Sequence, residues 1–185
     1  MAMSKEQRHP KAQDKGGRRR RNAPWLLGGG IVLIAAIGVG VYAYRAAADL
    51  PGQRFPDQGN RHVQTFSEAI PPYNSDPPTS GPHMPYIAPW GIHTEPLPRQ
   101  LQVHNLEDGG VMVQYHCPQG CPDLVAKLTA IVSSYDRQVI LAPYPGMKTR
   151  IALTAWTRLD AFDQIDESRI RRFIRAYRGI DHHSG

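Results

Sequence analysis

The chain has 185 residues, which is enough for one domain and an appendage but short for two full domains. Its formal net charge of +6 comes from the N-terminus, because residues 1–24 alone carry +6 whereas residues 49–185 contain 13 basic and 14 acidic side chains. The part that can fold therefore has no general attraction for polyanions, and the composition argues against a nucleic-acid partner.

Residues 25–44 contain no charged side chain over 20 positions. An α-helix of this length crosses ~30 Å of hydrocarbon, so we predict a single transmembrane helix. The basic residues before it predict a disordered tail, residues 1–24, that stays in the cytoplasm while the rest of the chain lies outside. A cleavable signal peptide is the alternative: Ala46 to Ala48 favour it, and Arg45 and the long apolar run disfavour it.

Proline dominates the chain after the predicted span. Eleven of the 17 prolines lie between Pro51 and Pro98, and proline removes a backbone donor, so no long helix is expected there. We predict a stalk over residues 45–67. Residues 71–98 are predicted to be irregular and to wrap over the folded part, because Tyr86 and Trp90 are too apolar for a pure linker.

Regular patterns begin near residue 101. Leu101 to His104 and Val111 to His116, joined by a turn ending in Gly109-Gly110, predict a β-hairpin. A helix of about 13 residues is predicted from Pro122, which suits a first helical position. Two further strands, 139–142 and 151–156, are expected to precede a closing helix with Asp166 as its N-cap.

The predicted order is therefore ββαββα, an α+β domain with its helices on one face of a small sheet. It would span residues 68–180 and leave a short tail, residues 181–185. No phosphate-binding glycine loop, Gly-x-Ser-x-Gly elbow or His-Glu-x-x-His motif occurs in the chain. We therefore expect a binding or structural protein rather than an enzyme.

Candidate metal ligands gather between residues 73 and 121, where four of the eight histidines and both cysteines lie. Thiolate with imidazole favours thiophilic metals such as copper(I) or zinc. The predicted metal ligands are Cys117 and Cys121 with His104 or His83, and copper delivery or storage is the leading hypothesis.

The same cysteines allow two other interpretations. Only three residues separate Cys117 from Cys121, so in an oxidising compartment they can form a structural disulfide. The protein would then be a non-catalytic module that scaffolds a membrane complex and binds a membrane-protein partner. A thiol–disulfide oxidoreductase is the third hypothesis, disfavoured because the predicted order lacks a central βα unit.

Several motifs stand out together: the string Tyr-Asn-Ser-Asp-Pro-Pro-Thr-Ser-Gly-Pro-His at residues 73–83, the segments 103–107 and 109–111, Ala155-Trp156 and the helix at 173–177. Together they resemble a bacterial family called domain of unknown function 3105. The resemblance covers residues 66–180 and brings no established activity. It implies a single membrane span, hence a bacterial cytoplasmic membrane location. Members commonly have histidine where this chain has Asp108, which would replace nitrogen by oxygen if that residue is a ligand.

A more local similarity covers residues 115–122, Tyr-His-Cys-Pro-Gln-Gly-Cys-Pro. This segment resembles the Cys-Pro-x-x-Cys-Pro loop of Sco-type copper-delivery proteins. That resemblance implies two sulfur ligands with a distant histidine as the third.

Overall fold

The structure is a computed structural model, and it describes residue 33, residues 35–41 and residues 50–183. The chain divides into two compact units, Met1–Ala48 and Asp49–Gly185. In the first unit, Leu33 and residues 35–41 are helical and exposed. Among the described residues there is no helix that combines the length and apolar character needed to span a bilayer. The predicted tail and most of the predicted span, residues 25–44, lie outside the described residues.

The second unit is an α+β domain built on one mixed six-stranded sheet. The predicted fold class, α+β, is therefore confirmed. In chain order its elements are β1 (Gln53–Arg54), β2 (Gly91–Ile92), α2 (Arg99–Glu107), β3 (Val111–Tyr115), α3 (Pro122–Val132), β4 (Val139–Pro143), β5 (Ile151–Ala155), β6 (Arg158–Phe162) and α4 (Glu167–Tyr177). The strand order in the sheet is β1-β6-β5-β3-β4-β2. Strand β4 pairs in parallel with β2 and β3, and the remaining neighbours are antiparallel.

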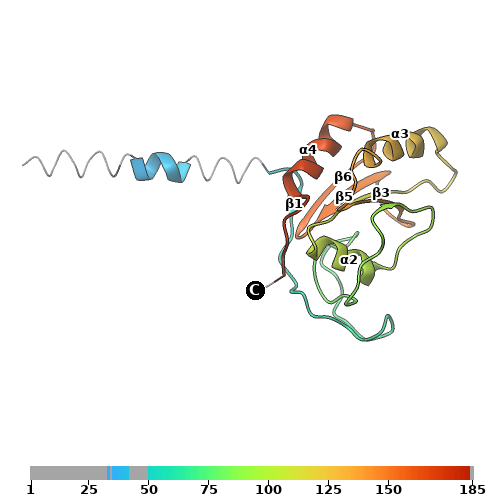
Figure 1. The fold of residues 1–185 in the computed structure, drawn as a ribbon, viewed down its shortest axis with the longest axis horizontal. Coiled ribbons are helices and arrows are strands. Elements are labelled where there is room, and N and C mark those ends of the chain that lie inside the picture. The colour runs from blue at the N-terminus through green and yellow to red at the C-terminus, as the bar shows by residue number, and fades with distance from the viewer. Residues whose placement is uncertain (1–32, 34, 42–49, 184–185) are drawn as a thin grey trace, which may run out of the picture. The chain divides into compact units, whose positions relative to one another are not determined.

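Alternate side chains of the central strands enter two different cores, as the period of a strand requires. Val113, Leu141 and Leu153 face the layer formed by α3 and α4. Met112 and Ile140 face the opposite layer, which contains α2 and the proline-rich segment. Figure 1 shows α3 and α4 on one side of the sheet and α2 on the other. The prediction that the helices share one face was therefore wrong.

The predicted hairpin is the largest error in secondary structure. Leu101 to His104, expected as its first strand, lies inside helix α2. An alternation of apolar and polar residues over only four positions does not distinguish the strand period of 2 residues from the helix period of 3.6 residues. Val103 and Leu106 favour the helix, because on a helix both side chains lie on one side, where they are fully buried against the sheet. Gly109, with φ of 75°, then joins a helix to β3 instead of closing a hairpin.

The stalk predicted for residues 45–67 is not present over residues 50–67, which form part of the domain instead. Gln53–Arg54 pairs with β6 as an edge strand, and Val63 is fully buried. Strand β6 had no predicted counterpart; it returns from β5 through Thr157, whose φ is 59°. The long segment before α2 wraps over the domain as predicted. Asn105 anchors that segment by exchanging two hydrogen bonds of 2.9 Å with the backbone of Ala88.

The later elements agree with the sequence patterns. Helix α3 begins at Pro122, and β4 and β5 occupy the two predicted apolar runs. Helix α4 has Asp166 as its N-cap, and the Asp166 carboxylate accepts a hydrogen bond of 3.0 Å from the Arg169 backbone N–H. These segments are long or strongly periodic, so their local pattern and their tertiary environment require the same conformation.

Candidate metal centre

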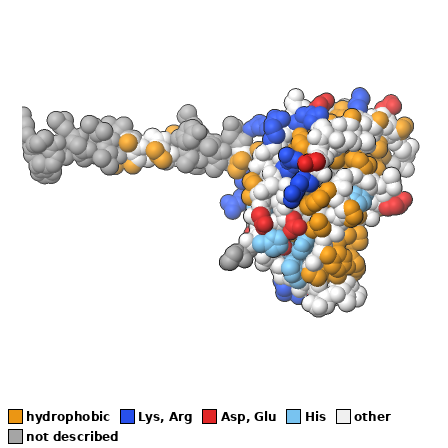
Figure 2. Space-filling model, in the orientation of Figure 1, with side chains coloured by type: hydrophobic (Ala, Val, Ile, Leu, Met, Phe, Trp, Pro, Cys, Tyr) orange, Lys and Arg blue, Asp and Glu red, His pale blue; other side chains and the backbone are white. Residues whose placement is uncertain are grey.

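Three histidines and one glutamate come together beside the C-terminal end of α2. His62, His83, His104 and Glu107 each offer one ligand atom, and all four atoms lie within 4.8 Å of one another. The imidazole centroids of His62, His83 and His104 are 5.0 to 5.2 Å apart. Figure 2 shows histidine side chains next to acidic side chains on one face of the domain.

Two backbone segments and one helix position these four side chains. His62 and His83 are paired by a parallel backbone bridge. The Val63 N–H stabilises this bridge by donating a hydrogen bond of 2.7 Å to the His83 carbonyl. His104 and Glu107 are three residues apart on α2, so both project from one face of that helix. Segments distant in the sequence thus bring their imidazoles to the same carboxylate.

Glu107 lies at the centre of the cluster and is fully buried. Its Oε2 is 2.9 Å from His83 Nε2, 3.7 Å from His62 Nε2 and 3.9 Å from His104 Nδ1. Ligands of a tetrahedral ion with bonds of ~2.0 to 2.1 Å are about 3.3 Å apart, so the observed separations bracket that value. Small side-chain movements would complete such a geometry.

Two buried atoms of this cluster have no hydrogen-bond partner, namely Glu107 Oε1 and His104 Nδ1. An unpaired buried polar atom costs about 1 to 3 kcal/mol, and such atoms are rare in folded proteins. A bound cation would use the free electron pairs of both. The residues present therefore fit a metal ion.

A backbone contact orients His83 for ligation, and the surroundings of His104 favour its neutral form. His83 Nδ1 lies 2.8 Å from the Gly81 carbonyl, which can only accept, so Nδ1 carries the proton and Nε2 faces Glu107. Metal-binding histidines commonly have this second contact. For His104, burial lowers the pKa of the imidazole, and the Asp108 carboxylate partly offsets that effect. A neutral His104 keeps a lone pair available for an ion.

A second group of potential ligands overlaps the first and consists of His104, Asp108 and His183. His183 Nε2 is 3.4 Å from Glu107 Oε2 and 3.6 Å from Asp108 Oδ1. The end of the chain is held there by His182 N–H, which donates to the Glu107 carbonyl at 2.9 Å. His183 Nδ1 donates a hydrogen bond of 2.7 Å to the Asp181 carboxylate, which raises the pKa of His183 and leaves Nε2 as the nitrogen near Glu107. His183 is thus placed to add a further nitrogen.

The structure brings together only part of the predicted ligand set. His83 and His104 share the cluster, whereas Cys117 and Cys121 are joined by a disulfide with a Cα–Cα distance of 5.8 Å. Neither cysteine belongs to a group of potential ligands among the described residues. The disulfide considered as an alternative is present, and a site combining two sulfurs with an imidazole stays a prediction.

Sequence reasoning missed His62, Glu107 and His183 as members of a site, and it raised Asp108 only through the family resemblance. His62 and His183 had no local signal, since each reaches the cluster only through tertiary packing. The residues on α2 did have one: His104, Glu107 and Asp108 are spaced i, i+3 and i+4, which places them together on a helix. The predicted hairpin concealed this spacing, because it placed His104 at the end of a strand and Glu107 and Asp108 in the turn that follows.

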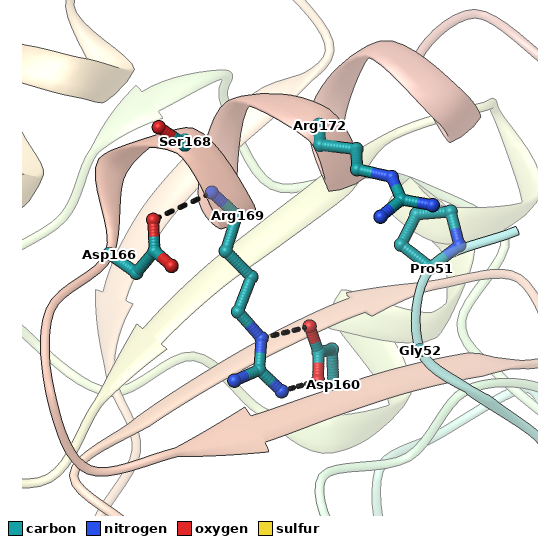
Figure 3. A pocket seen from close by; sticks show the side chains of 7 residues that line it. All are labelled: Pro51, Gly52, Asp160, Asp166, Ser168, Arg169 and Arg172. Atoms are coloured by element: carbon teal, nitrogen blue, oxygen red, sulfur yellow. Dashed lines mark hydrogen bonds and ion pairs between the residues drawn. The ribbon is translucent and has the colours of Figure 1, made fainter. Parts of the chain in front are cut away.

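A second concave surface lies beside helix α4 (Figure 3), lined by Pro51, Gly52, Asp160, Asp166, Ser168, Arg169 and Arg172. Its central contact is bidentate, with Arg169 Nε donating to Asp160 at 2.8 Å and Nη2 at 2.6 Å. The guanidinium also lies 4.3 Å from the centre of the Phe162 ring. Arg169 and Asp160 bind each other, which is the pattern of a structural ion pair joining α4 to β6.

We expect Arg169→Ala to lower the free energy of unfolding by about 1 to 3 kcal/mol, because Asp160 would remain largely buried without its charged donor. Chemical denaturation measures this change. Arg175→Ala, on an exposed part of the same helix, is the control and should change stability by less than about 0.5 kcal/mol. Equal stability of the two variants would contradict a structural role for the pair.

The fold and the cluster together define an α+β domain with a candidate metal centre on one face of its sheet and a disulfide at the start of α3. The chain belongs to the family described as "Protein of unknown function (DUF3105)", whose family model matches residues 63–184. The match begins one residue after His62 and includes His83, His104 and Glu107. No curated protein and no solved structure shows significant similarity to the chain.

Proposed function

We propose that this protein is a membrane-anchored, extracytoplasmic metal-binding protein that holds one divalent transition-metal ion, copper(II) by preference, for delivery or storage. The ligands are His62, His83, His104 and Glu107. The observation that carries the proposal is the buried Glu107 carboxylate, which faces three imidazoles while its Oε1 and His104 Nδ1 lack partners.

The donor atoms determine the class of metal. With both sulfurs in a disulfide, the cluster offers nitrogen and carboxylate oxygen, which suit copper(II), zinc and nickel(II) better than copper(I). Among divalent ions of the first row, copper(II) binds such ligands most tightly. The proposal therefore keeps copper from the sequence hypothesis and changes its oxidation state and its ligands.

The exposure of the ligands supports exchange of the ion with a partner. The His83 and Glu107 side chains are 0% and 1% exposed, whereas those of His62 and His183 are 42% and 45% exposed. An ion held between them would be fixed on one side and reachable on the other. This asymmetry favours delivery or storage over a purely structural role, in which a closed site is typical.

The proposed location rests on the sequence. The basic residues 1–24 and the uncharged run 25–44 favour an anchor whose following domain lies outside the cytoplasm. The disulfide supports the same location, because disulfides persist mainly in oxidising compartments.

The disulfide itself favours a second candidate function, a structural or interaction module of a membrane complex. Closing so short a loop stabilises a protein by about 2 kcal/mol in the chain-entropy treatment. This role accounts for Cys117 and Cys121 but gives no reason for burying Glu107 among imidazoles. The metal titration below separates the two candidates.

We expect the purified full-length chain, in detergent, to bind one equivalent of Cu²⁺ with a dissociation constant below about 1 µM, and His62→Ala to weaken binding at least about tenfold. His62 is exposed, so its removal should leave the fold intact. Competition titration against a chelator measures the affinity, and electron paramagnetic resonance of bound Cu²⁺ should show imidazole nitrogen couplings that decrease in number in the variant.

The matched control is His116→Ala, which removes a histidine located beside the disulfide and outside the cluster. Its affinity should equal that of the unchanged protein. The proposal fails if the chain binds Cu²⁺ no more tightly than about 100 µM. It also fails if His116→Ala loses as much affinity as His62→Ala.

A further inference from the structure

The Cys117–Cys121 disulfide lies between strand β3 and helix α3. Cys117 lies two residues after the end of β3, and Cys121 is the N-cap of α3, which leads into β4. Strands β3 and β4 are parallel neighbours, so the cysteine pair lies at the strand-to-helix junction of a βαβ unit. Cysteine pairs beside βαβ units also occur in thioredoxin-like redox motifs, where two residues separate the cysteines instead of the three found here. This strand–helix–strand order agrees with the one predicted for residues 111–142.

The start of α3 favours a thiolate on Cys121. The N-cap makes no side-chain hydrogen bond, and Pro122 follows it, so the first N–H groups of the helix have no side-chain acceptor. These groups and the helix dipole stabilise negative charge at the N-terminus, although Asp123 adds an opposing charge in the first turn. Cys121 is therefore the better leaving group of the pair.

A substrate can approach the disulfide from solvent. Both cysteines are half-buried, and the loop between them, residues 118–120, is exposed. The pair opens into a cleft of about 380 Å³ whose other wall is Lys148, Thr149 and Arg150. Lys148 and Arg150 are exposed cations, so the cleft attracts the thiolate form of an incoming thiol.

The geometry points to Cys117–Cys121 as a redox-active disulfide that accepts two electrons from a dithiol substrate. This inference is independent of the proposed metal site. It concerns residues that belong to neither group of potential ligands.

The exchange has two steps. A substrate thiolate attacks Cys117 Sγ, forming a mixed disulfide and breaking the Cys117–Cys121 bond, whose electron pair leaves on Cys121 Sγ as a thiolate at the helix N-terminus. The second substrate thiolate then attacks the substrate sulfur of the mixed disulfide. This attack closes the substrate disulfide and releases Cys117, which takes a proton from water. The substrate loses two electrons and the cysteine pair gains them.

The roles of the two sulfurs are tested by alkylation of the single variants. At pH 7, iodoacetamide should modify Cys121 in Cys117→Ser at least about tenfold faster than it modifies Cys117 in Cys121→Ser, because the helix N-terminus ionises only the former. Mass spectrometry of the full-length chain follows the reaction. Equal rates, or the reverse order, would overturn the assignment of Cys121 as the leaving group.

Exchange itself is tested with reduced glutathione and with dithiothreitol, in the presence of a chelator so that bound metal has no influence. Both reagents should reduce the disulfide while circular dichroism stays that of the folded protein. Replacing Lys148 and Arg150 together by alanine should slow the reaction with glutathione at least about threefold. Lys127→Ala, an exposed cation on α3 outside the cleft, is the control and should have no effect.

One result would refute the redox role: reduction that occurs only after denaturant unfolds the domain. The disulfide would then be structural, and the metal proposal would be unaffected. Conversely, failure of the unchanged protein to bind Cu²⁺ would leave the inferred exchange at Cys117 unaffected, so each proposal can fail alone.

Discussion

Replacing Glu107 by glutamine should weaken Cu²⁺ binding by at least about 100-fold and change the free energy of unfolding of the metal-free protein by less than about 1 kcal/mol. The carboxylate is the one anionic ligand of the group formed with His62, His83 and His104. Its loss removes the charge that offsets a divalent ion at a site where Glu107 is fully buried.

The stability of the metal-free variant should be nearly unchanged for two reasons. Glutamine has the shape of glutamate, and its amide can still hydrogen-bond His83 Nε2, which lies 2.9 Å from Glu107 Oε2. The neutral amide also avoids burying a charge whose Oε1 has no partner. A residue retained for function often costs stability, so separate changes in affinity and stability distinguish a ligand from a structural group.

Chelator competition measures the affinity, and urea denaturation in the presence of a chelator measures the stability. Glu95→Gln, an exposed carboxylate, is the matched control and should alter neither quantity. If Glu107→Gln destabilised the metal-free domain by more than about 3 kcal/mol and left Cu²⁺ affinity unchanged, Glu107 would be structural.

Phe173→Ala should lower the free energy of unfolding by about 3 to 5 kcal/mol. Phe173 lies on α4 and is fully buried in the core between the sheet and helices α3 and α4. The centroid of its ring is 4.8 Å from that of the Tyr177 ring. Truncation removes a large apolar side chain and leaves a cavity that the sheet cannot fill.

Urea denaturation monitored by circular dichroism gives the stability, with Arg175→Ala on the exposed side of α4 as the control. Cu²⁺ affinity under native conditions should remain unchanged, because the candidate centre is built on α2, in the layer across the sheet from Phe173. A loss below about 1 kcal/mol would show that α4 contributes little to the core.

The parts of the fold that were predicted correctly have strong local signals. Pro122 marks the start of α3, and Asp166 with the stripe through Ile170 and Phe173 marks α4. Helix α2 was assigned incorrectly because the residues it buries are mixed: beside Val103 and Leu106 it buries polar side chains, including Gln102. Its apolar period is therefore weak, and packing against β3 decides its conformation.

The candidate functional residues also include some that the sequence could predict and others that it could not. Cys117 and Cys121 are near neighbours in the chain, so their pairing was open to prediction beside the metal-ligand hypothesis. His62 and His83 meet through a backbone bridge between distant loops, and His183 arrives from the end of the chain. No periodicity connects these positions, so their convergence on Glu107 had no signal in the sequence.

The sequence by itself determined the α+β class, helices α3 and α4, the central apolar strands and the cysteine pair, because each depends on residues close together in the chain. Tertiary structure alone decided which histidines share a carboxylate, on which face α2 packs, and that β3, α3 and β4 form a parallel unit. These features depend on contacts between segments many residues apart, and the free energy of burying apolar side chains on both faces of one sheet selects them.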